Sequence, residues 1–187
     1  MKRAGLALAG AILLAGCAIT SGSGGGGDVV RDHVADGFLT SGMERRATGP
    51  DGALYVVNFA PEGTIGRVVA GRGGKGIAQL FATLPAGSIG NGIRFTADGQ
   101  MLVADYKRHR ILTVSPAGDV STHVELPGAH QPNDIALARD GTIYASDPDW
   151  KTGTGRIWRV DRQRRAHILD TGMGTTNGIE VSPDGRR

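Results

Sequence analysis

Four polar side chains stand at repeated positions in this sequence of 187 residues. They are Glu44, Asn91, Asn133 and Asn177, and each lies seven residues before an Asp-Gly pair. One carboxylate and three amides offer oxygen ligands, which hard cations such as Ca²⁺ prefer. No His or Cys belongs to the set, so a zinc site is not expected. The pattern therefore predicts an oxygen-lined calcium site, provided that the fold brings the four residues together.

The repeat itself predicts how they could meet. The Asp-Gly pairs begin at residues 51, 98, 140 and 184. The first three are followed by apolar strand-like runs at residues 53–59, 100–106 and 142–148. Asp-Gly between two such runs predicts a β-hairpin, because both residues tolerate positive φ.

A second polar position ends each of these hairpins, seven residues after the Asp, at Asn58, Asp105 and Asp147. Two antiparallel strands of this length bring both polar positions to the same edge of the sheet. The alternative is that these three residues cap strand ends by bonding to nearby backbone.

Further strand-like runs complete each unit, at residues 110–116, 121–126, 156–161 and 165–170. Four strands in about 44 residues is the size of a β-propeller blade. The 31 glycines and 40% hydrophobic content suit an all-β chain with many tight turns. Equivalent residues of successive blades form a ring, so we expect Glu44, Asn91, Asn133 and Asn177 at one mouth of a central channel.

Residues 29–187 are predicted to form a partial propeller of blades one to four, with the fourth incomplete. They amount to about three and a half blades, whereas closed propellers have four to eight. We interpret the sequence, which stops at Arg187, as a fragment; the alternative is closure by pairing with another chain. The 187-residue chain alone is expected to be inactive and to aggregate through its exposed last strands.

The N-terminus predicts export and a lipid anchor. Lys2 and Arg3 precede an apolar stretch at residues 6–15, and Leu-Ala-Gly-Cys17 resembles the lipobox of bacterial lipoproteins. Residues 1–17 are the predicted signal peptide and residues 18–28 a Gly/Ser-rich tether. The expected location is the cell envelope, on the periplasmic or extracellular face; the alternative is an ordinary signal peptide with an incidental cysteine. Cys17 is the only cysteine, so neither an internal disulfide nor a thiolate metal site is expected.

Charge does not indicate a nucleic-acid partner. The formal net charge is +3, from 21 Lys and Arg against 18 Asp and Glu. Removal of Lys2 and Arg3 with the signal peptide leaves about +1. Three arginines cluster at residues 162–165, which we interpret as a solvated turn between strands. No obligate protein partner is inferred.

Three segments carry a family resemblance: LYVVNFAPEGTIGRV, QPNDIALARDGTIYASDPDW and NGIEVSPDGRR. They resemble the gluconolactonase / senescence-marker-protein (regucalcin) family of six-bladed propellers, over nearly everything after the tether. The resemblance implies a metal-dependent lactone hydrolase, usually with calcium bound in the central channel.

Position by position, the resemblance implies metal ligands at Glu44, Asn133 and Asn177. It also implies a later Asp, beyond Arg187, as a further ligand and the usual general base. Arg45 and Arg46 stand where the family has Gly-Pro, and they would compete with a cation for the Glu44 carboxylate.

Substrate contacts are expected from Asn91, Asp134 and Asp147, with His130 as a second candidate base. A loop histidine with no role is the alternative reading of His130. The implied mechanism is polarisation of the lactone carbonyl by the cation, with a base near the attacking water. The alternative function is a non-catalytic NHL-like binding propeller, since the fold hosts both. The lone carboxylate in the ring favours the hydrolase, because a scaffold has no need for it.

Overall fold

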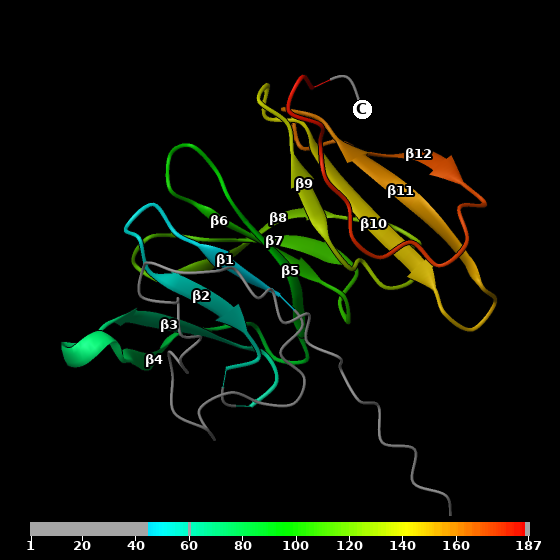
Figure 1. Ribbon diagram of the computed structural model, residues 1–187. Helices are drawn as coiled ribbons and strands as arrows, with labels where there is room; N and C mark the ends of the chain where they lie inside the picture. Colours follow the sequence, from blue (N-terminus) through cyan, green and yellow to red (C-terminus); the bar gives the residue numbers. More distant parts are fainter. Residues whose placement is uncertain (1–44, 60, 186–187) are drawn as a thin grey trace, which may run out of the picture. The chain divides into compact units, whose positions relative to one another are not determined.

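The computed structural model describes residues 45–59 and 61–185, which form three four-stranded antiparallel sheets (Figure 1). The first sheet contains β1 (Arg46–Thr48), β2 (Leu54–Val57), β3 (Thr64–Ala70) and β4 (Gly76–Thr83), with the short 3-10 helix η1 (Arg72–Gly74) between the last two. The second contains β5 (Gly90–Phe95), β6 (Met101–Asp105), β7 (Arg110–Val114) and β8 (Val120–Glu125). The third contains β9 (Ile135–Leu137), β10 (Ile143–Asp149), β11 (Thr154–Val160) and β12 (Ala166–Thr171).

The prediction of an all-β chain built from four-stranded propeller units is confirmed. In each sheet the strands follow one another in chain order, and the first strands β1, β5 and β9 lie in contact from sheet to sheet. The predicted signal peptide, tether, Cys17 and Glu44 fall outside the described residues. Arg187, at which the fourth blade is predicted to break off, falls outside them as well. Within residues 45–59 and 61–185, no helix is long and apolar enough to cross a membrane.

The Asp-Gly pairs form the predicted turns, but with a different geometry. Only the glycine has positive φ, at 75° in Gly52, 83° in Gly99 and 85° in Gly141. In the second sheet the Gly99 N–H donates to Thr96 O and the Thr96 N–H donates to Gln100 O. A turn followed by one left-handed glycine thus closes each hairpin, in place of a two-residue turn with both residues left-handed.

Two apolar layers hold the sheets together. Alternate residues of β6 point to opposite faces, so Met101 and Val103 pack against the first sheet. Leu102 and Ala104 pack against the third sheet. All four side chains are at most 1% exposed. The near-continuous apolar sequence of β6 follows from this burial on both faces.

The segment after β12 differs from expectation. Residues 179–181 form no strand, although the predicted turn is present, with the Gly185 N–H donating to Ser182 O. A strand requires a partner for its backbone groups. Here the Ile179 N–H instead donates to the Asp134 carboxylate.

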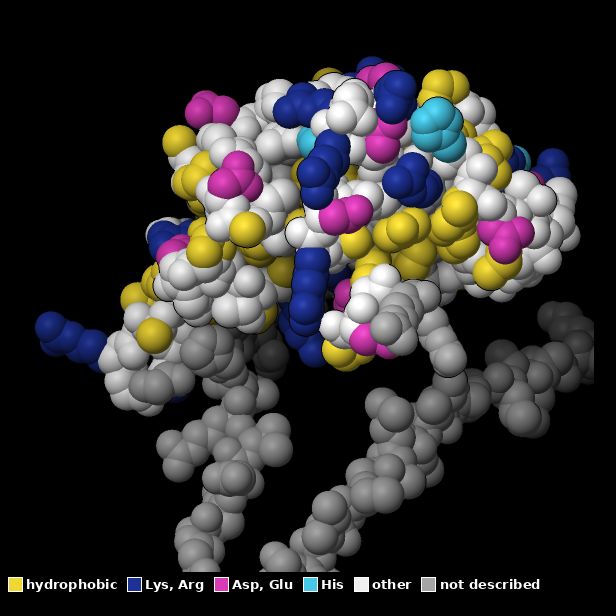
Figure 2. Space-filling model, turned by 90° about the horizontal axis from the view of Figure 1, so that it is seen from above, with side chains coloured by type: hydrophobic (Ala, Val, Ile, Leu, Met, Phe, Trp, Pro, Cys, Tyr) yellow, Lys and Arg dark blue, Asp and Glu magenta, His cyan; other side chains and the backbone are white. Residues whose placement is uncertain are grey.

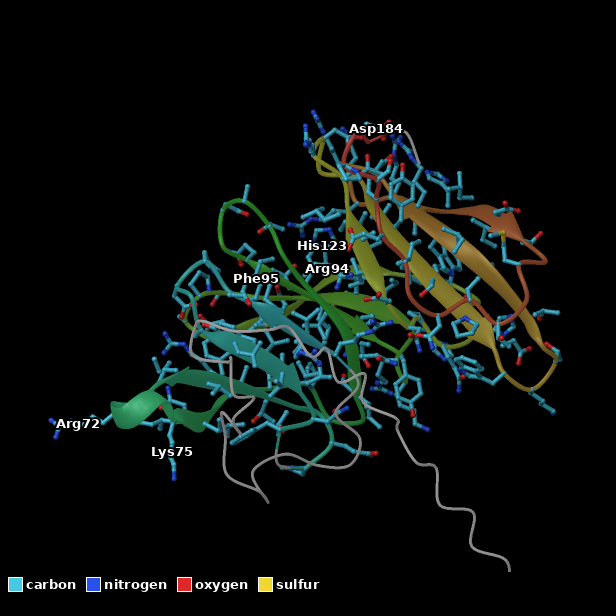
Figure 3. All side chains as sticks on the ribbon, in the orientation of Figure 1. Arg72, Lys75, Arg94, Phe95, His123 and Asp184 are labelled. Atoms are coloured by element: carbon cyan, nitrogen blue, oxygen red, sulfur yellow. The ribbon has the colours of Figure 1, made fainter. Side chains whose placement is uncertain are left out.

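The charged side chains on the face shown in Figure 2 are of both signs. Dark blue Lys and Arg side chains alternate with magenta Asp and Glu side chains, and hydrophobic side chains are exposed between them. Figure 3 shows Lys75 and Arg72 at the tip of the β3–β4 connection, in the sequence GRGGKG.

His123 is a partly buried histidine between two of the sheets. It lines a cavity of about 520 Å³ with Leu102, Leu137 and Ile143, at the boundary of the second and third sheets. Its Nδ1 lies 3.1 Å from Thr113 Oγ1. Burial, and then the positive charge of Arg164, lowers the pKa of His123 below its ordinary value.

We expect the free energy of unfolding to fall as the pH drops below about 6.5, because the unfolded chain takes up the His123 proton first. A His123→Gln variant should lose part of this pH dependence in urea titrations at successive pH values. His167→Gln, at an exposed position on β12, is the control. Equal pH profiles for His123→Gln and the wild type would contradict the assignment.

Candidate functional site

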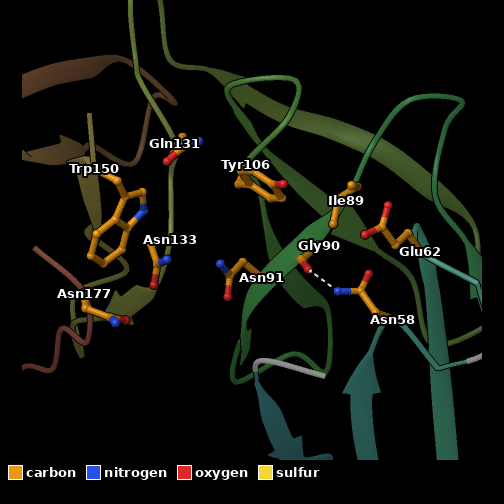
Figure 4. A pocket seen from close by; sticks show the side chains of 10 residues that line it. All are labelled: Asn58, Glu62, Ile89, Gly90, Asn91, Tyr106, Gln131, Asn133, Trp150 and Asn177. Atoms are coloured by element: carbon orange, nitrogen blue, oxygen red, sulfur yellow. Dashed lines mark hydrogen bonds between the residues drawn. The ribbon is translucent and has the colours of Figure 1, made fainter. Parts of the chain in front are cut away.

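A pocket of about 470 Å³ collects the amide side chains that the repeat singled out (Figure 4). Its lining residues are Asn58, Glu62, Ile89, Gly90, Asn91, Tyr106, Gln131, Asn133, Trp150 and Asn177. The prediction that Asn91, Asn133 and Asn177 meet at one mouth is confirmed. Glu44, the fourth member, lies outside the described residues.

A β-bulge aims Asn91 at the pocket. Between the pairs Gly90–Asp105 and Ile93–Val103, β5 carries two residues where β6 carries one. Asn91 and Gly92 therefore oppose the single residue Ala104, and the extra residue turns the side chain out of the regular alternation.

The third sheet repeats this bulge. The Asn133 N–H donates to Ser146 O at 2.8 Å, and the Ser146 N–H donates to Asp134 O at 3.1 Å. Two residues again oppose one, just before the regular pair Ile135–Ala145. The shared Asn-Gly-Ile and Asn-Asp-Ile sequences thus place Asn91 and Asn133 in equivalent positions.

Successive bulges are bonded to each other across the sheets. The Gly92 N–H donates to Asn133 O at 2.7 Å. A Cβ on Gly92 would lie 2.8 Å from the Asp134 Cα, closer than real contacts allow. Glycine at this position permits the second and third sheets to approach at the pocket.

Asn91 contributes a buried acceptor without a partner. Its side chain is 8% exposed, and Oδ1 has no hydrogen-bond partner within the described part of the chain. A buried amide oxygen left unpaired costs free energy unless a ligand or water satisfies it. Asn91 lines a polar pocket, so this oxygen is a candidate for contact with a ligand or a water molecule.

Asp134 does not line the pocket, and its role as a substrate contact stays a prediction. It is 1% exposed, and its carboxylate pairs with Arg94 Nη1 and Arg45 Nη2, each at 3.4 Å. The N–H groups of Ile135 and Ile179 also donate to it. Figure 3 shows Arg94 between the second sheet and β9. The carboxylate therefore joins both of the other sheets and the 177–180 segment to β9.

Asp147 does not line the pocket either, and its role as a substrate contact stays a prediction. It is fully buried and accepts hydrogen bonds from the N–H groups of His130 and Gln131. The Trp158 indole donates to its other oxygen at 2.9 Å, and Arg156 lies 3.5 Å away. Asp147 thereby fixes the loop that leads to Asn133.

The other two strand-end residues follow the same rule, as the capping alternative predicted. Asp105 is fully buried and accepts from Arg110 Nε at 3.0 Å. Asn58 lies on the pocket wall, yet its Nδ2 donates to Gly90 O and its Oδ1 accepts from the Gly63 N–H. Both hold backbone in place.

His130 is not among the pocket-lining residues. Its Nε2 contacts the Arg156 guanidinium, and its Nδ1 lies 3.9 Å from Asp149 Oδ2. The role of His130 as a base stays a prediction, and both ring nitrogens have neighbours outside the pocket lining. The other predicted base, an Asp beyond Arg187, lies outside the described residues and stays a prediction.

Sequence reasoning missed six lining residues: Glu62, Tyr106, Gln131 and Trp150, which have polar or aromatic side chains, and Ile89 and Gly90. Tyr106 follows Asp105 directly, whereas Trp150 stands three residues after Asp147. Because these offsets differ, the repeat gives no common position for the two aromatic residues. Trp150 is 50% exposed at the pocket. Glu62 lies in the β2–β3 connection, and nothing in its local sequence marks it.

The donor set fits a hard cation in part. Asn133 and Asn177 supply amide oxygens to one pocket, which is suitable chemistry for calcium. The Arg45 Nη2 already donates to Asn177 Oδ1 at 3.2 Å. Within residues 45–59 and 61–185, no group of three or more His, Cys, Asp or Glu side chains is arranged to hold a metal ion.

Comparisons with known proteins agree with this architecture. Residues 120–160 match the family model for the strictosidine synthase-like N-terminal region. A gluconolactonase of Zymomonas mobilis is 24% identical over 120 residues, which are 54% of this chain and 34% of that protein.

Two solved structures share the fold. Regucalcin of Agrobacterium tumefaciens, described as a calcium-binding protein, matches with a TM-score of 0.58 and 21% identity, over 79% of this chain and 48% of its own. Virginiamycin B lyase of Staphylococcus aureus matches with a TM-score of 0.60 and 20% identity, over 75% of this chain and 45% of its own.

The resemblance to gluconolactonase and regucalcin-like propellers is confirmed. The matched parts cover less than half of each of these relatives. The lyase has the same architecture, so the fold by itself does not define a reaction.

Neutralising Asp134 should destabilise the site. Asp134→Asn keeps the shape but leaves the Arg45 and Arg94 guanidinium groups without their shared carboxylate, and we expect a loss of about 1–3 kcal/mol in the free energy of unfolding. Urea denaturation measures it.

The matched control is Glu180→Gln, which removes the other carboxylate paired with Arg94. That carboxylate is 73% exposed, so its loss should cost less than about 0.5 kcal/mol. Equal effects of the two variants would show that burial of Asp134 does not matter.

Proposed function

We propose that the pocket is part of the active site of a lactonase-type hydrolase that uses a divalent cation, calcium first. The observation that carries the proposal is the convergence of Asn91, Asn133 and Asn177 on one pocket, with a buried unpaired amide oxygen among them. The resemblance to gluconolactonases supports the reaction class, and the calcium-binding regucalcin supports the choice of cation.

Glu44, Asn133 and Asn177 are the proposed cation ligands. When bound, the cation supplies electrophilic polarisation of the lactone carbonyl. The buried Asn91 Oδ1 accepts a hydrogen bond from a substrate hydroxyl, which gives this orphan atom its partner.

Glu62 carries the only carboxylate that lines the pocket among the described residues. It is exposed, and its oxygens can accept the proton of an attacking water. Trp150 and Tyr106 present aromatic surface beside Gln131 (Figure 4), which suits a ring with one apolar face and hydroxyl groups at its edge. A sugar lactone has this chemistry.

We further propose that lipidation of Cys17 attaches the protein to the cell envelope. The segment lies outside the described residues, and the lipobox-like sequence is the support. Metabolic labelling with a radioactive fatty acid tests it, and Cys17→Ser should remove the label.

Hydrolysis is tested on the protein as its gene encodes it, by proton release from glucono-1,5-lactone above the spontaneous rate. We expect activity with Ca²⁺ and its loss with EDTA. Asn91→Ala should lower kcat/KM by about tenfold, the equivalent of one hydrogen bond. Gln79→Ala removes an exposed amide on β4 and is the control, with unchanged activity.

Absence of hydrolysis for a panel of sugar and aliphatic lactones, with the fold intact, would overturn the hydrolase and favour the non-catalytic binding propeller.

Removal of the Trp150 indole should weaken substrate binding. Trp150→Ala is expected to raise KM about fivefold with little change in kcat, because a stacking surface acts on bound substrate and transition state alike. Steady-state kinetics measure both constants. Trp150→Phe, which keeps an aromatic ring, should recover most of the affinity, and equal KM values for all three proteins would exclude Trp150 from the substrate site.

A further inference from the structure

Arg45 places a positive charge beside Asn177, one of the proposed cation ligands. Its Nη2 lies 3.2 Å from Asn177 Oδ1 and 3.4 Å from Asp134 Oδ2. The side chain is one-third exposed, and it precedes β1 directly. The same guanidinium nitrogen lies against Gly178, where a Cβ would be 3.4 Å away.

Asp134 has other partners besides Arg45. Arg94 Nη1 lies 3.4 Å from its Oδ1, and the Ile135 N–H donates to that oxygen. The Ile179 N–H donates to Oδ2. Asp134 therefore faces two guanidinium groups. Arg94 also pairs with the exposed Glu180 carboxylate at 3.4 Å, whereas Arg45 also lies against Asn177.

The Arg45 charge acts against a second cation at Asn177. Asn177 Oδ1 is a proposed ligand, and its hydrogen bond to Arg45 occupies the lone pair nearest the guanidinium. A divalent ion bound at Asn177 would also meet the Arg45 charge at close range, where electrostatic repulsion is strong because screening is incomplete.

We propose that Arg45 is a built-in competitor of the metal ion. Without metal, its guanidinium holds Asn177 and the 177–180 segment against Asp134. Binding of a divalent cation displaces the guanidinium from Asn177, so Arg45 weakens the cation affinity of this site. The proposal rests on the proposed metal-dependent function and concerns the regulation of its site.

Two consequences follow for an Arg45→Gln variant. The cation no longer displaces a charged group, so it should bind about tenfold more tightly, the effect of one nearby like charge. The metal-free variant loses a contact to the 177–180 segment. Added Ca²⁺ should therefore raise the melting temperature of the variant more than that of the wild type at equal concentration.

The experiment is isothermal titration of Ca²⁺ into the wild type, Arg45→Gln and Arg46→Gln. Arg46 is exposed on β1, so Arg46→Gln makes the same change in net charge at the adjacent residue and serves as the control. We expect less than a twofold change for Arg46→Gln. Arg45→Lys keeps the charge but not the forked guanidinium, and its affinity should stay close to the wild-type value.

Equal affinities for Arg45→Gln and Arg46→Gln would overturn the proposal, and so would weaker binding by Arg45→Gln. Absence of measurable Ca²⁺ binding in all four proteins would overturn it as well. Arg94 still neutralises Asp134 in the variant, so we expect a folded protein, which circular dichroism checks.

Failure of this proposal is distinguishable from failure of the hydrolase. If lactone hydrolysis requires Ca²⁺ but Arg45→Gln does not change the Ca²⁺ affinity, only the proposal that Arg45 competes with the metal ion is rejected. If Arg45→Gln binds Ca²⁺ more tightly but no lactone is hydrolysed, the proposal for Arg45 stands and the hydrolase proposal fails. The protein would then be a binding protein with a cation site.

Discussion

The buried carboxylate of Asp134 is the constraint on which the rest of the site depends. An ionised carboxylate that is 1% exposed must be compensated by charges and N–H donors. Its partners come from before β1, from β5 and from the segment after β12. Because these partners belong to separate parts of the chain, one charge fixes the relative positions of the segments that carry the amides.

The β-bulge that is repeated in the second and third sheets directs the amide side chains into the pocket. In the second and third sheets, the first bulge residue, Asn91 or Asn133, points into the pocket. The second bulge residue faces the neighbouring sheet. This residue is Gly92 in the second sheet and Asp134 in the third sheet. Gly92 is required because the backbone of the next bulge lies where its Cβ would be. Asp134 instead reaches the Ile179 N–H, which has no strand partner.

Residues of similar type have opposite roles at the two ends of each hairpin. Asn58, Asp105 and Asp147 all hold local backbone, because each side chain accepts from N–H groups of the loops beside it. Asn91 Oδ1 has no such group within reach in the described part of the chain. The availability of backbone donors, more than residue type, separates structural from ligand-facing positions here.

The sequence by itself determined the repeat, the four-stranded units and the gathering of three amides, because hairpin turns and strand periodicity are local properties. Only the tertiary structure decided which polar residues stay free. The predicted substrate contacts Asp134 and Asp147 and the candidate base His130 all have partners within the fold. Glu62 and Trp150 reach the pocket from loops whose paths no local pattern records. These outcomes depend on contacts between segments distant in sequence, and such contacts have no signature in spacing alone.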